Sequence, residues 1–326
     1  MRPSSRLFAI ATSLVLLVGG LVAYTIFDNN RFVVIHQNVT IPNLPSQFEG
    51  YTILQISDLH SKSFGKNQSE LISMIKSLDY DLVAVTGDVQ NHLNDDLQPF
   101  FDLVDSIDPR DGILLTSGNV DPYFVDFYTG QVTPKGKEMQ SHGCRLLDYP
   151  VAVERNGARI WFSELFDDRR RENQWVRRRS TGPLDVHYDP AEAAALHQIY
   201  QAEIDSIFKG ITIRDTLIGI THYPVIQNVL DDPAHGGMLP FDLVLAGHYH
   251  GGQIRFPFLG AIYVPIPSQP RSGLFPDQRI VSGLYQGNGM QQYISRGMGA
   301  GGPVPLMMFR FLNTPEINLL TLHASK

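Results

Sequence analysis

The sequence predicts an α/β protein in which a single membrane-length helix precedes the folded part. Three observations support this prediction. A long uncharged segment lies near the N-terminus, and strand-like and helix-like segments alternate after it. The 326 residues are 43% hydrophobic and 18% charged, which is enough apolar material for a sizeable core and excludes a disordered or coiled-coil chain.

The N-terminal segment at residues 7–27 contains no charged side chain. As a helix it would span about 31 Å, close to the hydrocarbon thickness of a bilayer. We expect an uncleaved anchor, because the apolar part of a cleaved signal peptide, the alternative, usually has about 7–15 residues. Arg2 and Arg6 precede the segment, and the positive-inside rule places them in the cytoplasm. The protein is therefore expected in the cell membrane as a single-pass protein, with everything after Asp28 outside the cytoplasm.

The rest of the chain begins with a β-α-β-α-β order, which indicates a core of parallel strands. Strands are expected at residues 51–57, 81–86 and 112–117, and helices at residues 69–78 and 97–107. Further strands are expected at residues 158–162, 216–221 and 241–246, and a further helix at residues 191–207. In the last quarter, Gly- and Pro-rich turns separate short strands expected at residues 292–295, 306–311 and 317–322, a pattern more typical of antiparallel sheet. Because no repeat or linker is visible, we expect one domain at residues 29–326, after the anchor at residues 1–28.

Charge and cysteine content exclude several classes of function. The net charge of −7 argues against a general nucleic-acid-binding protein, whose surface would be basic. The single cysteine, Cys144, excludes a disulfide framework within the chain and a zinc site built from cysteines. Eleven histidines remain as candidate metal ligands.

Five of the expected strands run directly into side chains that commonly bind metal ions. These residues are Asp58, His60, Asp88, Asn119, His222, His248 and His250. In open α/β sheets ligands bind beyond the carboxyl ends of the strands, so five separate points of the chain can meet there. The pairs Asp58/His60 and His248/His250 are spaced i,i+2, which in extended backbone puts both side chains on one face. Any one of these residues alone is more often a turn residue or a core histidine, but together and in this order they indicate a metal site.

The donor set indicates two metal ions rather than one. Four imidazoles, two carboxylates and one amide oxygen are too many for a single tetrahedral zinc, and Asp88 is best placed to bridge two ions. Nitrogen and oxygen donors without thiolate suit Mn, Fe or Zn. Two divalent ions against two carboxylates leave a charge of about +2, which attracts phosphate and lowers the pKa of bound water.

The same residues carry a resemblance to a known family. The series SDLH, GD, GN, THYP and GHYHGGQ resembles the motifs of the calcineurin-like metallophosphoesterases, and within them the bacterial YkuE- and YaeI-like group with an N-terminal membrane segment. The resemblance runs from about Phe32 onward and implies an α/β (α+β) fold, a four-layer α/β/β/α sandwich. It also implies the two ligand groups: Asp58, His60 and His250 on one metal, Asn119, His222 and His248 on the other, and Asp88 bridging both.

One position departs from the family pattern. The third motif usually reads Gly-Asn-His, whereas this chain has Val120 after Asn119. In the family that histidine contacts the phosphate or protonates the leaving group, which is worth about 10²–10⁴-fold in rate. Valine can do neither, so the general acid is unknown, and a good leaving group such as a phosphate would need it least. His92 and His142 are the two loop histidines that could supply a proton, although the sequence does not place them.

Six arginines cluster at residues 169–179, around Trp175. The ordinary interpretation is a solvated loop or helix face. The sharper alternatives are contacts with anionic lipid headgroups or with a phosphorylated substrate. In the family this region belongs to a variable cap over the site, expected here around residues 122–210.

The leading hypothesis is a membrane-anchored dimetal phosphoesterase. It would hydrolyse a phosphodiester, a phosphomonoester or a pyrophosphate bond by attack of a metal-bound hydroxide. Its expected substrate is a phosphorylated small molecule or lipid, including lipid-linked or envelope phosphates, because the anchor keeps the site near the bilayer. The alternative is a metal-binding pseudoenzyme or interaction module, motivated by Val120.

Overall fold

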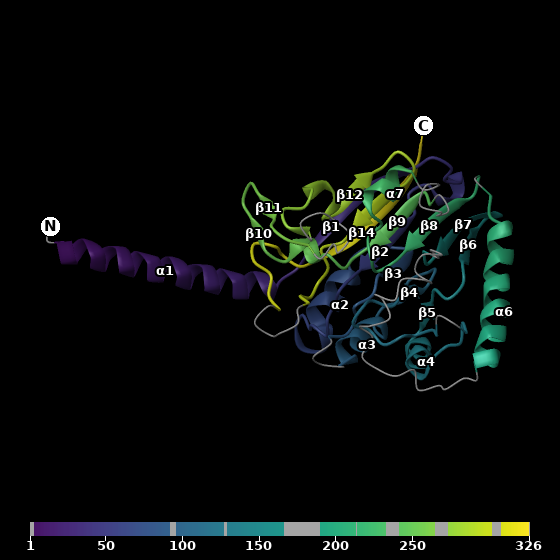
Figure 1. The fold of residues 1–326 in the computed structure, drawn as a ribbon, viewed down its shortest axis with the longest axis horizontal. Coiled ribbons are helices and arrows are strands. Elements are labelled where there is room, and N and C mark those ends of the chain that lie inside the picture. The colour runs from purple at the N-terminus through teal and green to yellow at the C-terminus, as the bar shows by residue number, and fades with distance from the viewer. Residues whose placement is uncertain are drawn as a thin grey trace.

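The computed structural model describes residues 3–91, 96–126, 129–165, 190–212, 214–232, 241–264, 273–301 and 308–325. These residues form an α/β protein with two mixed six-stranded sheets behind a long N-terminal helix (Figure 1). His92, the arginine cluster at residues 169–179 and Trp175 lie outside the described residues.

The first sheet contains the predicted parallel core. Its strands, in spatial order, are β1 (Val33–Ile41), β14 (Glu316–Ala324), β2 (Thr52–Ile56), β3 (Leu82–Val85), β4 (Ile113–Leu115) and β5 (Cys144–Leu146). Strands β2 to β5 are all parallel, whereas β14 runs antiparallel to β2 and parallel to β1. The β-α-β-α-β order of the sequence therefore gives parallel neighbours, as predicted.

The second sheet is also mixed. Its strands, in spatial order, are β12 (Gly283–Gln286), β13 (Gln291–Ile294), β9 (Leu243–Ala246), β8 (Thr216–Ile220), β7 (Ala158–Ser163) and β6 (Val151–Arg155). Strands β13, β9, β8 and β7 are parallel, and the edge strands β12 and β6 are antiparallel to their neighbours. A separate two-stranded hairpin is formed by β10 (Arg255–Phe256) and β11 (Gly260–Ala261).

Alternating side chains of the central strands point to two different cores. In β3, Leu82 and Ala84 face the core between the two sheets, where Ile218 and Leu243 of the second sheet join them. The intervening Val83 and Val85 face the opposite side, as the two-residue period of a strand requires. Central strands buried on both faces read as continuous apolar runs, which is why the sequence revealed them.

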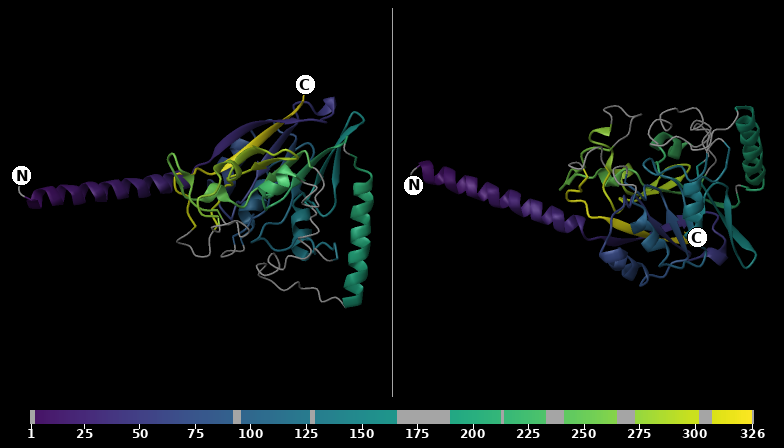
Figure 2. Two further views of the ribbon diagram at one scale, coloured as in Figure 1. Left: turned by 45° about the horizontal axis from the view of Figure 1, so that its top comes forward. Right: turned by 90° about the horizontal axis from the view of Figure 1, so that it is seen from below.

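Helices cover the outer faces of the sheets (Figures 1 and 2). Against the first sheet lie α2 (Ser69–Ile75), α3 (Gln98–Val104) and α4 (Pro134–Ser141). Against the second sheet lie α7 (Gln227–Asp231) and one end of α6 (Pro190–Lys209). Leu71 and Ile75 of α2 and Phe100 and Leu103 of α3 fill the core beneath the first sheet. Each helix thus buries one apolar stripe on the sheet and leaves its polar side in water.

The N-terminal helix α1 (Pro3–Asn29) projects away from the sheets over most of its length (Figures 1 and 2). Its span from Arg6 to Asn29 is long and apolar enough to cross a membrane. A signal sequence near the N-terminus would pass the same test, so the helix is either an anchor or a signal.

Two expectations for the last quarter are corrected by the structure. The expected strand at residues 306–311 is wrong in its described part: residues 308–311 form only a single bridge, between Phe311 and Ile254. The Arg310 backbone is bonded instead to the Asn29 side chain of α1. The quarter is also not uniformly antiparallel, because β13 pairs parallel to β9 and β14 parallel to β1.

None of the expected strands covers the short or edge strands β1, β5, β6, β10, β11 and β12. Two of these, β5 and β6, and the predicted β7 lie within residues 122–210, the expected cap. All three strands belong to the two central sheets, so part of the expected cap is in fact part of the core. The rest of the division into anchor, domain and cap remains a prediction.

Candidate metal centre

All seven predicted ligands are brought to the edge where the carboxyl ends of the two sheets meet. Asp58 and His60 follow β2, Asp88 follows β3, and Asn119 follows β4. His222 follows β8, and His248 and His250 follow β9. Five distant points of the chain thus converge because parallel strands end at the same edge.

The first group of side chains is fully buried. The potential ligand atoms of Asp58, His60, Asp88 and His250 all lie within 4.8 Å of one another. His60 Nε2 and His250 Nε2 are 3.3 Å apart, and His250 Nε2 is 3.7 Å from Asp58 Oδ1. Two imidazole nitrogens and two carboxylates that face one point form a set of donors for a cation.

The second group gathers around His222. Its Nε2 atom lies 2.9 Å from Asn119 Oδ1 and 3.1 Å from His248 Nδ1. Its Nδ1 atom lies 2.9 Å from the carbonyl oxygen of Thr86, which orients the ring so that Nε2 faces the other two side chains. A backbone partner on one nitrogen of a histidine is the arrangement that leaves the other nitrogen free to bind a metal.

Asp88 lies between the two groups. Its Oδ2 atom is 3.5 Å from His60 Nε2 and 3.4 Å from His222 Nε2. Its other oxygen, Oδ1, accepts a hydrogen bond from the backbone N–H of Val120 at 3.0 Å. One oxygen is therefore anchored to the loop after β4, and the other is equidistant from an imidazole of each group.

The relatives of the chain agree with this geometry. No model of a protein family matches the chain. It is 25% identical to the metallophosphoesterase YkuE of Bacillus subtilis over 295 residues, which cover 86% of this chain and 82% of YkuE. It is 32% identical to the phosphodiesterase YaeI of Escherichia coli over 103 residues, 32% of this chain and 31% of YaeI. A transmembrane protein with a metallophosphoesterase domain from Danio rerio is 23% identical over 69% of this chain and 45% of its own length.

Over most of its length the chain is similar to metallophosphoesterases. These relatives and the buried Asp/His cluster together identify a metal-dependent phosphoesterase, and that cluster is the part of the structure suited to hold metal. The donors in this cluster are nitrogen and oxygen atoms, a set that suits divalent metal ions and contains no thiolate.

Left-handed backbone occurs at five of the predicted ligands. Positive φ angles between 49° and 70° occur at Asp58, His60, Asp88, His248 and His250. Non-glycine residues adopt this conformation infrequently, at a cost of about 1–3 kcal/mol each. The packing of the surrounding strands has to stabilise these residues in this conformation. In it the chain turns sharply after each strand, which keeps the side chain at the edge of the sheet.

Two glycines permit the close approach of the ligand loops. A Cβ atom on Gly118 would lie 2.0 Å from Asp88 Oδ1, and one on Gly247 would lie 2.5 Å from Asp58 Oδ2. Neither position has room for a side chain, which explains why glycine precedes the ligands Asn119 and His248.

Asp121 supports the centre, and its role was not predicted. Its carboxylate is buried and accepts hydrogen bonds from the backbone N–H groups of Asp88 at 2.7 Å, Gly118 at 2.8 Å and Gln90 at 3.2 Å. It therefore ties the loop after β3 to the loop after β4. Burial and the nearby Asp88 carboxylate raise the pKa of Asp121 to about 7.

Electrostatics divides the histidines into two kinds. Burial lowers the pKa of His60 and lowers that of His250 further, so both imidazoles are neutral at pH 7 and have a lone pair for a metal. Burial acts the same way on His222, but the Asp88 carboxylate more than offsets it and raises the pKa of His222 to about 9. Without metal, His222 therefore holds a second proton, and His222 and His60 keep the pKa of Asp88 far below its ordinary value despite burial.

His142, one of the two histidines suggested as proton donors, lies away from the site. His142 precedes β5, so it lies at the amino end of the parallel strands, opposite the ligands. Its Nδ1 atom is 2.8 Å from Asp105 Oδ1, and its ring stacks on Phe101. His92 is outside the described residues.

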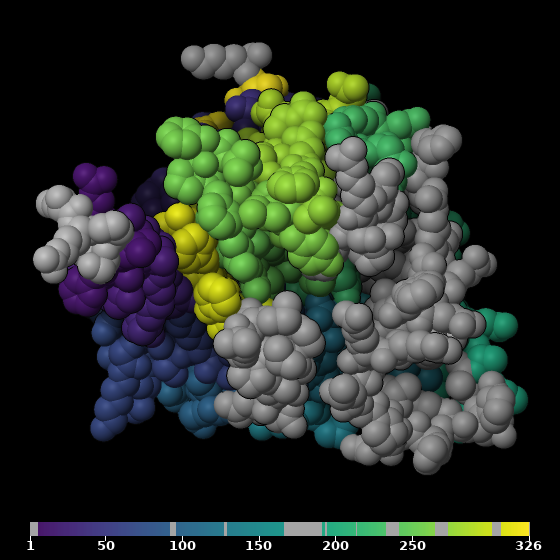
Figure 3. Space-filling view, turned by 60° about the vertical axis from the view of Figure 1, so that its left-hand side comes forward, coloured from purple at the N-terminus to yellow at the C-terminus, as the bar shows by residue number. Residues whose placement is uncertain are grey.

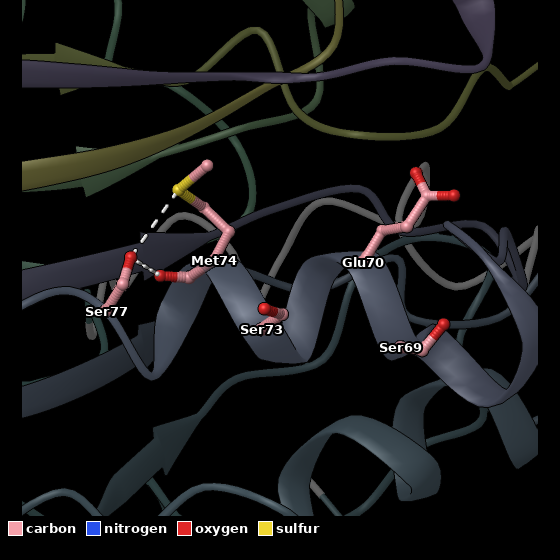
Figure 4. Close-up of a pocket in the computed structure, with 5 residues that line it drawn as sticks. All are labelled: Ser69, Glu70, Ser73, Met74 and Ser77. Atoms are coloured by element: carbon pink, nitrogen blue, oxygen red, sulfur yellow. Dashed lines mark hydrogen bonds between the residues drawn. The ribbon is translucent and has the colours of Figure 1, made fainter.

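A separate pocket lies along α2 (Figure 4). Ser69, Glu70, Ser73, Met74 and Ser77 line it. Glu70 is its single charged side chain, and the Ser77 hydroxyl is occupied by a hydrogen bond to the Met74 carbonyl at 2.6 Å. This lining offers a phosphate no cation, so the chemistry of the enzyme belongs to the strand ends.

Proposed function

We propose that this metallophosphoesterase holds two divalent ions, Mn, Fe or Zn, and hydrolyses a phosphodiester, phosphomonoester or pyrophosphate bond while anchored to a membrane. The observation that carries the proposal is the position of Asp88 Oδ2, between His60 Nε2 at 3.5 Å and His222 Nε2 at 3.4 Å. A bridging carboxylate between two ions would occupy this position. The helices on the outer faces of both sheets are consistent with the four-layer α/β/β/α sandwich that the resemblance implies.

The residues fall into two ligand groups around Asp88. Asp58, His60 and His250 would hold one ion, and Asn119, His222 and His248 would hold the other. Bound divalent ions would supply positive charge for the phosphate oxygens and lower the pKa of water at the site. The chain itself contributes orientation: Val120 N–H holds Asp88, and the Thr86 carbonyl holds His222.

The nature of the leaving group follows from Val120. Its backbone is used, since its N–H binds Asp88 and its carbonyl accepts from Gln90 Nε2 at 3.1 Å. Its side chain has no proton to give. We therefore propose that the natural substrate has a leaving group that needs little protonation, such as the phosphate released from a pyrophosphate bond.

A substrate panel tests this function against its alternative. The full chain in detergent, with Mn²⁺ added, is given an activated aryl phosphodiester, an aryl monoester and a dinucleotide pyrophosphate. Hydrolysis of at least one substrate, abolished by a chelator and restored by Mn²⁺, is expected. Bound metal at full stoichiometry without hydrolysis of any of the three would favour the metal-binding pseudoenzyme or interaction module.

The membrane location rests on α1, whose exposed apolar surface suits lipid, and on a relative described as a transmembrane protein. We propose an uncleaved single-pass anchor with Arg2 and Arg6 in the cytoplasm and the site outside. A reporter that is active only outside the cytoplasm, fused after Lys326, should be active, and one that works only in the cytoplasm should be silent. The opposite result would reverse the topology, and loss of residues 1–28 from the mature chain would show a cleaved signal instead.

A further inference from the structure

Exposed apolar side chains gather on one side of the folded domain. Outside α1, ten large apolar side chains are exposed among the described residues. Seven of them lie between residues 254 and 275, and an eighth is Phe309. We call the surface formed by these eight the apolar rim. Scattered exposed apolar residues are ordinary, but a concentration of this kind marks a binding surface.

The tip of the β10–β11 hairpin is the most exposed part of the apolar rim. Phe258 in the turn is fully exposed, and the neighbouring Leu259 is 63% exposed. Residues 273–275 lie beside the segment that follows β11, because Phe275 N–H donates to the carbonyl of Ile262 at 2.7 Å and Tyr263 forms a bridge with Leu274. Phe275 is itself 62% exposed, so two loops present aromatic rings to the surroundings.

The two aromatic tips have an unusual backbone. Phe258 has a φ of 67° and Phe275 a φ of 49°, in the left-handed region where Gly, Asn or Asp are the usual residues. A phenylalanine there is strained and gains no packing in water. A backbone outlier at two exposed phenylalanines is a reason to look for a binding role of this surface.

The apolar rim is joined directly to the end of α1. The Asn29 side chain donates to the Arg310 carbonyl at 2.6 Å and accepts from the Arg310 N–H at 2.8 Å. One residue further, Phe311 N–H donates to the Gln253 carbonyl, and Arg255 N–H donates to the Phe311 carbonyl, both at 3.0 Å. The helix end and the base of the hairpin are thus linked by four hydrogen bonds, two between the Asn29 side chain and the Arg310 backbone and two made by the backbone of Phe311.

A second set of contacts fixes the same joint. Asp28 is buried and bonds to Arg31 at 2.6 Å and to the Thr314 hydroxyl at 2.8 Å. Lys62, two residues after the ligand His60, donates to the carbonyl of Asn29. The direction of α1 relative to the domain is therefore held by several polar contacts rather than by a flexible linker.

The figures show the resulting arrangement. In Figure 1 the β10–β11 hairpin forms the edge of the domain beside the point where α1 leaves it. In Figure 3, which turns this side forward, the purple surface of α1, a yellow surface from the C-terminal part and the light green surface around β10 and β11 lie next to one another. A bilayer crossed by α1 would meet the apolar rim at its surface.

We propose that the apolar rim is a second membrane-contact surface, which inserts Phe258, Leu259 and Phe275 into the interface of the bilayer crossed by α1. The inference rests on the proposed anchor and adds an orientation to it. Aromatic and aliphatic side chains beside a spanning helix are suited to the headgroup and upper acyl region.

The proposal places the metal centre close to the membrane surface. The hairpin begins five residues after the ligand His250, and the buried Arg310 guanidinium donates to the His250 carbonyl at 3.3 Å and the Gly299 carbonyl at 2.7 Å. The segment that joins α1 to the hairpin therefore also contacts the loop of a ligand. The phosphate of a lipid headgroup would then lie at the same distance from the bilayer centre as the metal centre.

Spin labels in the full chain, reconstituted into vesicles of a zwitterionic and an anionic phospholipid, test the proposal. Single cysteines replace Phe258 (Phe258→Cys), Ile199 on α6 (Ile199→Cys) and Leu17 in α1 (Leu17→Cys). Ile199 is the matched control, since it is an exposed apolar residue at 57% on the far side of the domain. The native Cys144 is buried, and the unsubstituted chain measures its residual labelling.

The label at 258 should collide more with oxygen and less with a water-soluble nickel complex than the label at 199, and the label at 17 should be the deepest. If the label at 258 is as accessible to nickel as the one at 199 while the label at 17 is in lipid, the proposal that the apolar rim contacts the membrane is wrong, and the proposed anchor stands. A protein occupant of this surface would give that same result in pure lipid. Nickel access at 17 as well would reject the anchor together with the inference, and hydrolysis of a soluble aryl phosphodiester in the same samples reports the enzymatic proposal separately.

A functional readout sharpens the test. The double variant Phe258→Ser with Leu259→Ser should lower hydrolysis of a phosphodiester embedded in vesicles about tenfold and leave the soluble aryl phosphodiester unchanged. Equal rates on the embedded substrate for variant and parent would contradict a role of the apolar rim in presenting lipid.

Discussion

Strand β3 has an aspartate at each end, and the two are held in different ways. At the amino end, Asp81 accepts hydrogen bonds from Arg155 Nη2 and from the Thr52 N–H, both at 2.9 Å. At the carboxyl end, Asp88 faces the imidazoles of His60 and His222. The first carboxylate is satisfied by a cation that the chain itself supplies. The second shares its surroundings with another buried carboxylate and several imidazole nitrogens.

The comparison extends to the neighbouring strand. Asp111, at the amino end of β4, also binds Arg155 at 2.9 Å and accepts from the Tyr51 hydroxyl at 2.9 Å. Arg155 comes from β6 of the other sheet, so this ion pair joins the two sheets. At the amino end of the strands, the carboxylates are therefore paired with an arginine and join the two sheets. At the carboxyl end, the ion-pair partners of Asp58 and Asp88 in the described part of the chain are imidazoles. The carboxyl end is built to receive cations from outside.

The largest expected effect separates the two aspartates. Asp88→Ala should lower bound metal from about two ions per chain to one or none, and hydrolysis should fall with it, because the position between both ligand groups is lost. Asp81→Ala should keep its metal but lose thermal stability. Elemental analysis and thermal unfolding of both variants measure this. Unchanged metal content in Asp88→Ala, or metal loss in Asp81→Ala, would remove the distinction between the two ends.

The next effect concerns the apolar residue at the catalytic end. Val120→His should raise hydrolysis of alkyl phosphodiesters by up to roughly 10²-fold and that of activated aryl esters little, because only poor leaving groups need a proton. The new ring also crowds a half-buried position, so metal content and thermal unfolding serve as controls. With these unchanged, equal effects on both substrate classes would show that another residue already acts as the acid.

Glycines at the two ends of β4 offer a matched pair. Gly118→Ala should weaken metal binding by about 10–100-fold, because the added Cβ would displace Asp88 Oδ1. Gly112→Ala has open space around it but a φ of 87°, so it should lower stability by about 1 kcal/mol and leave metal affinity unchanged. Metal titration of both variants checks this. Similar affinities would mean that the loops adjust around the extra methyl group.

The smallest effect is expected in the pH dependence of stability that comes from Asp81, at the amino end of β3. Although burial alone would raise it, the hydrogen bonds from Arg155 and Thr52 lower the pKa of Asp81. A carboxylate with a lowered folded-state pKa stabilises the fold above its unfolded pKa, and this contribution is lost as pH falls. Arg155→Met should therefore cost about 1–3 kcal/mol at pH 7 and flatten the fall in Tm between pH 5 and pH 3. A parallel pH profile in variant and parent would show that Arg155 does not act through Asp81.

Much of the centre could be predicted because strands buried on both faces are continuous apolar runs that end at a polar residue. This pattern revealed β2, β3, β4, β8 and β9 together with the ligands that follow them. The three-residue β5 and the edge strand β1 lack that pattern, and so they were missed. Asp121 was not recognised because its partners are backbone N–H groups, in the loop after β3 and in its own loop after β4, and a sequence pattern does not show such contacts. The apolar rim was missed for a related reason, since exposure depends on which neighbours the fold supplies.

Strand β14 has a consequence for the order of events in synthesis. It lies between β1 and β2, so the two first strands of the chain are paired only through residues 316–324. At about 5–20 residues per second, β1 waits roughly 15 to 60 s after its own synthesis for its partner. During that interval α1 is already available to the translocation machinery, and the chain behind it has no completed first sheet. The first sheet is therefore completed only when the last residues of the chain have been made, and β1 stays without its neighbour until then.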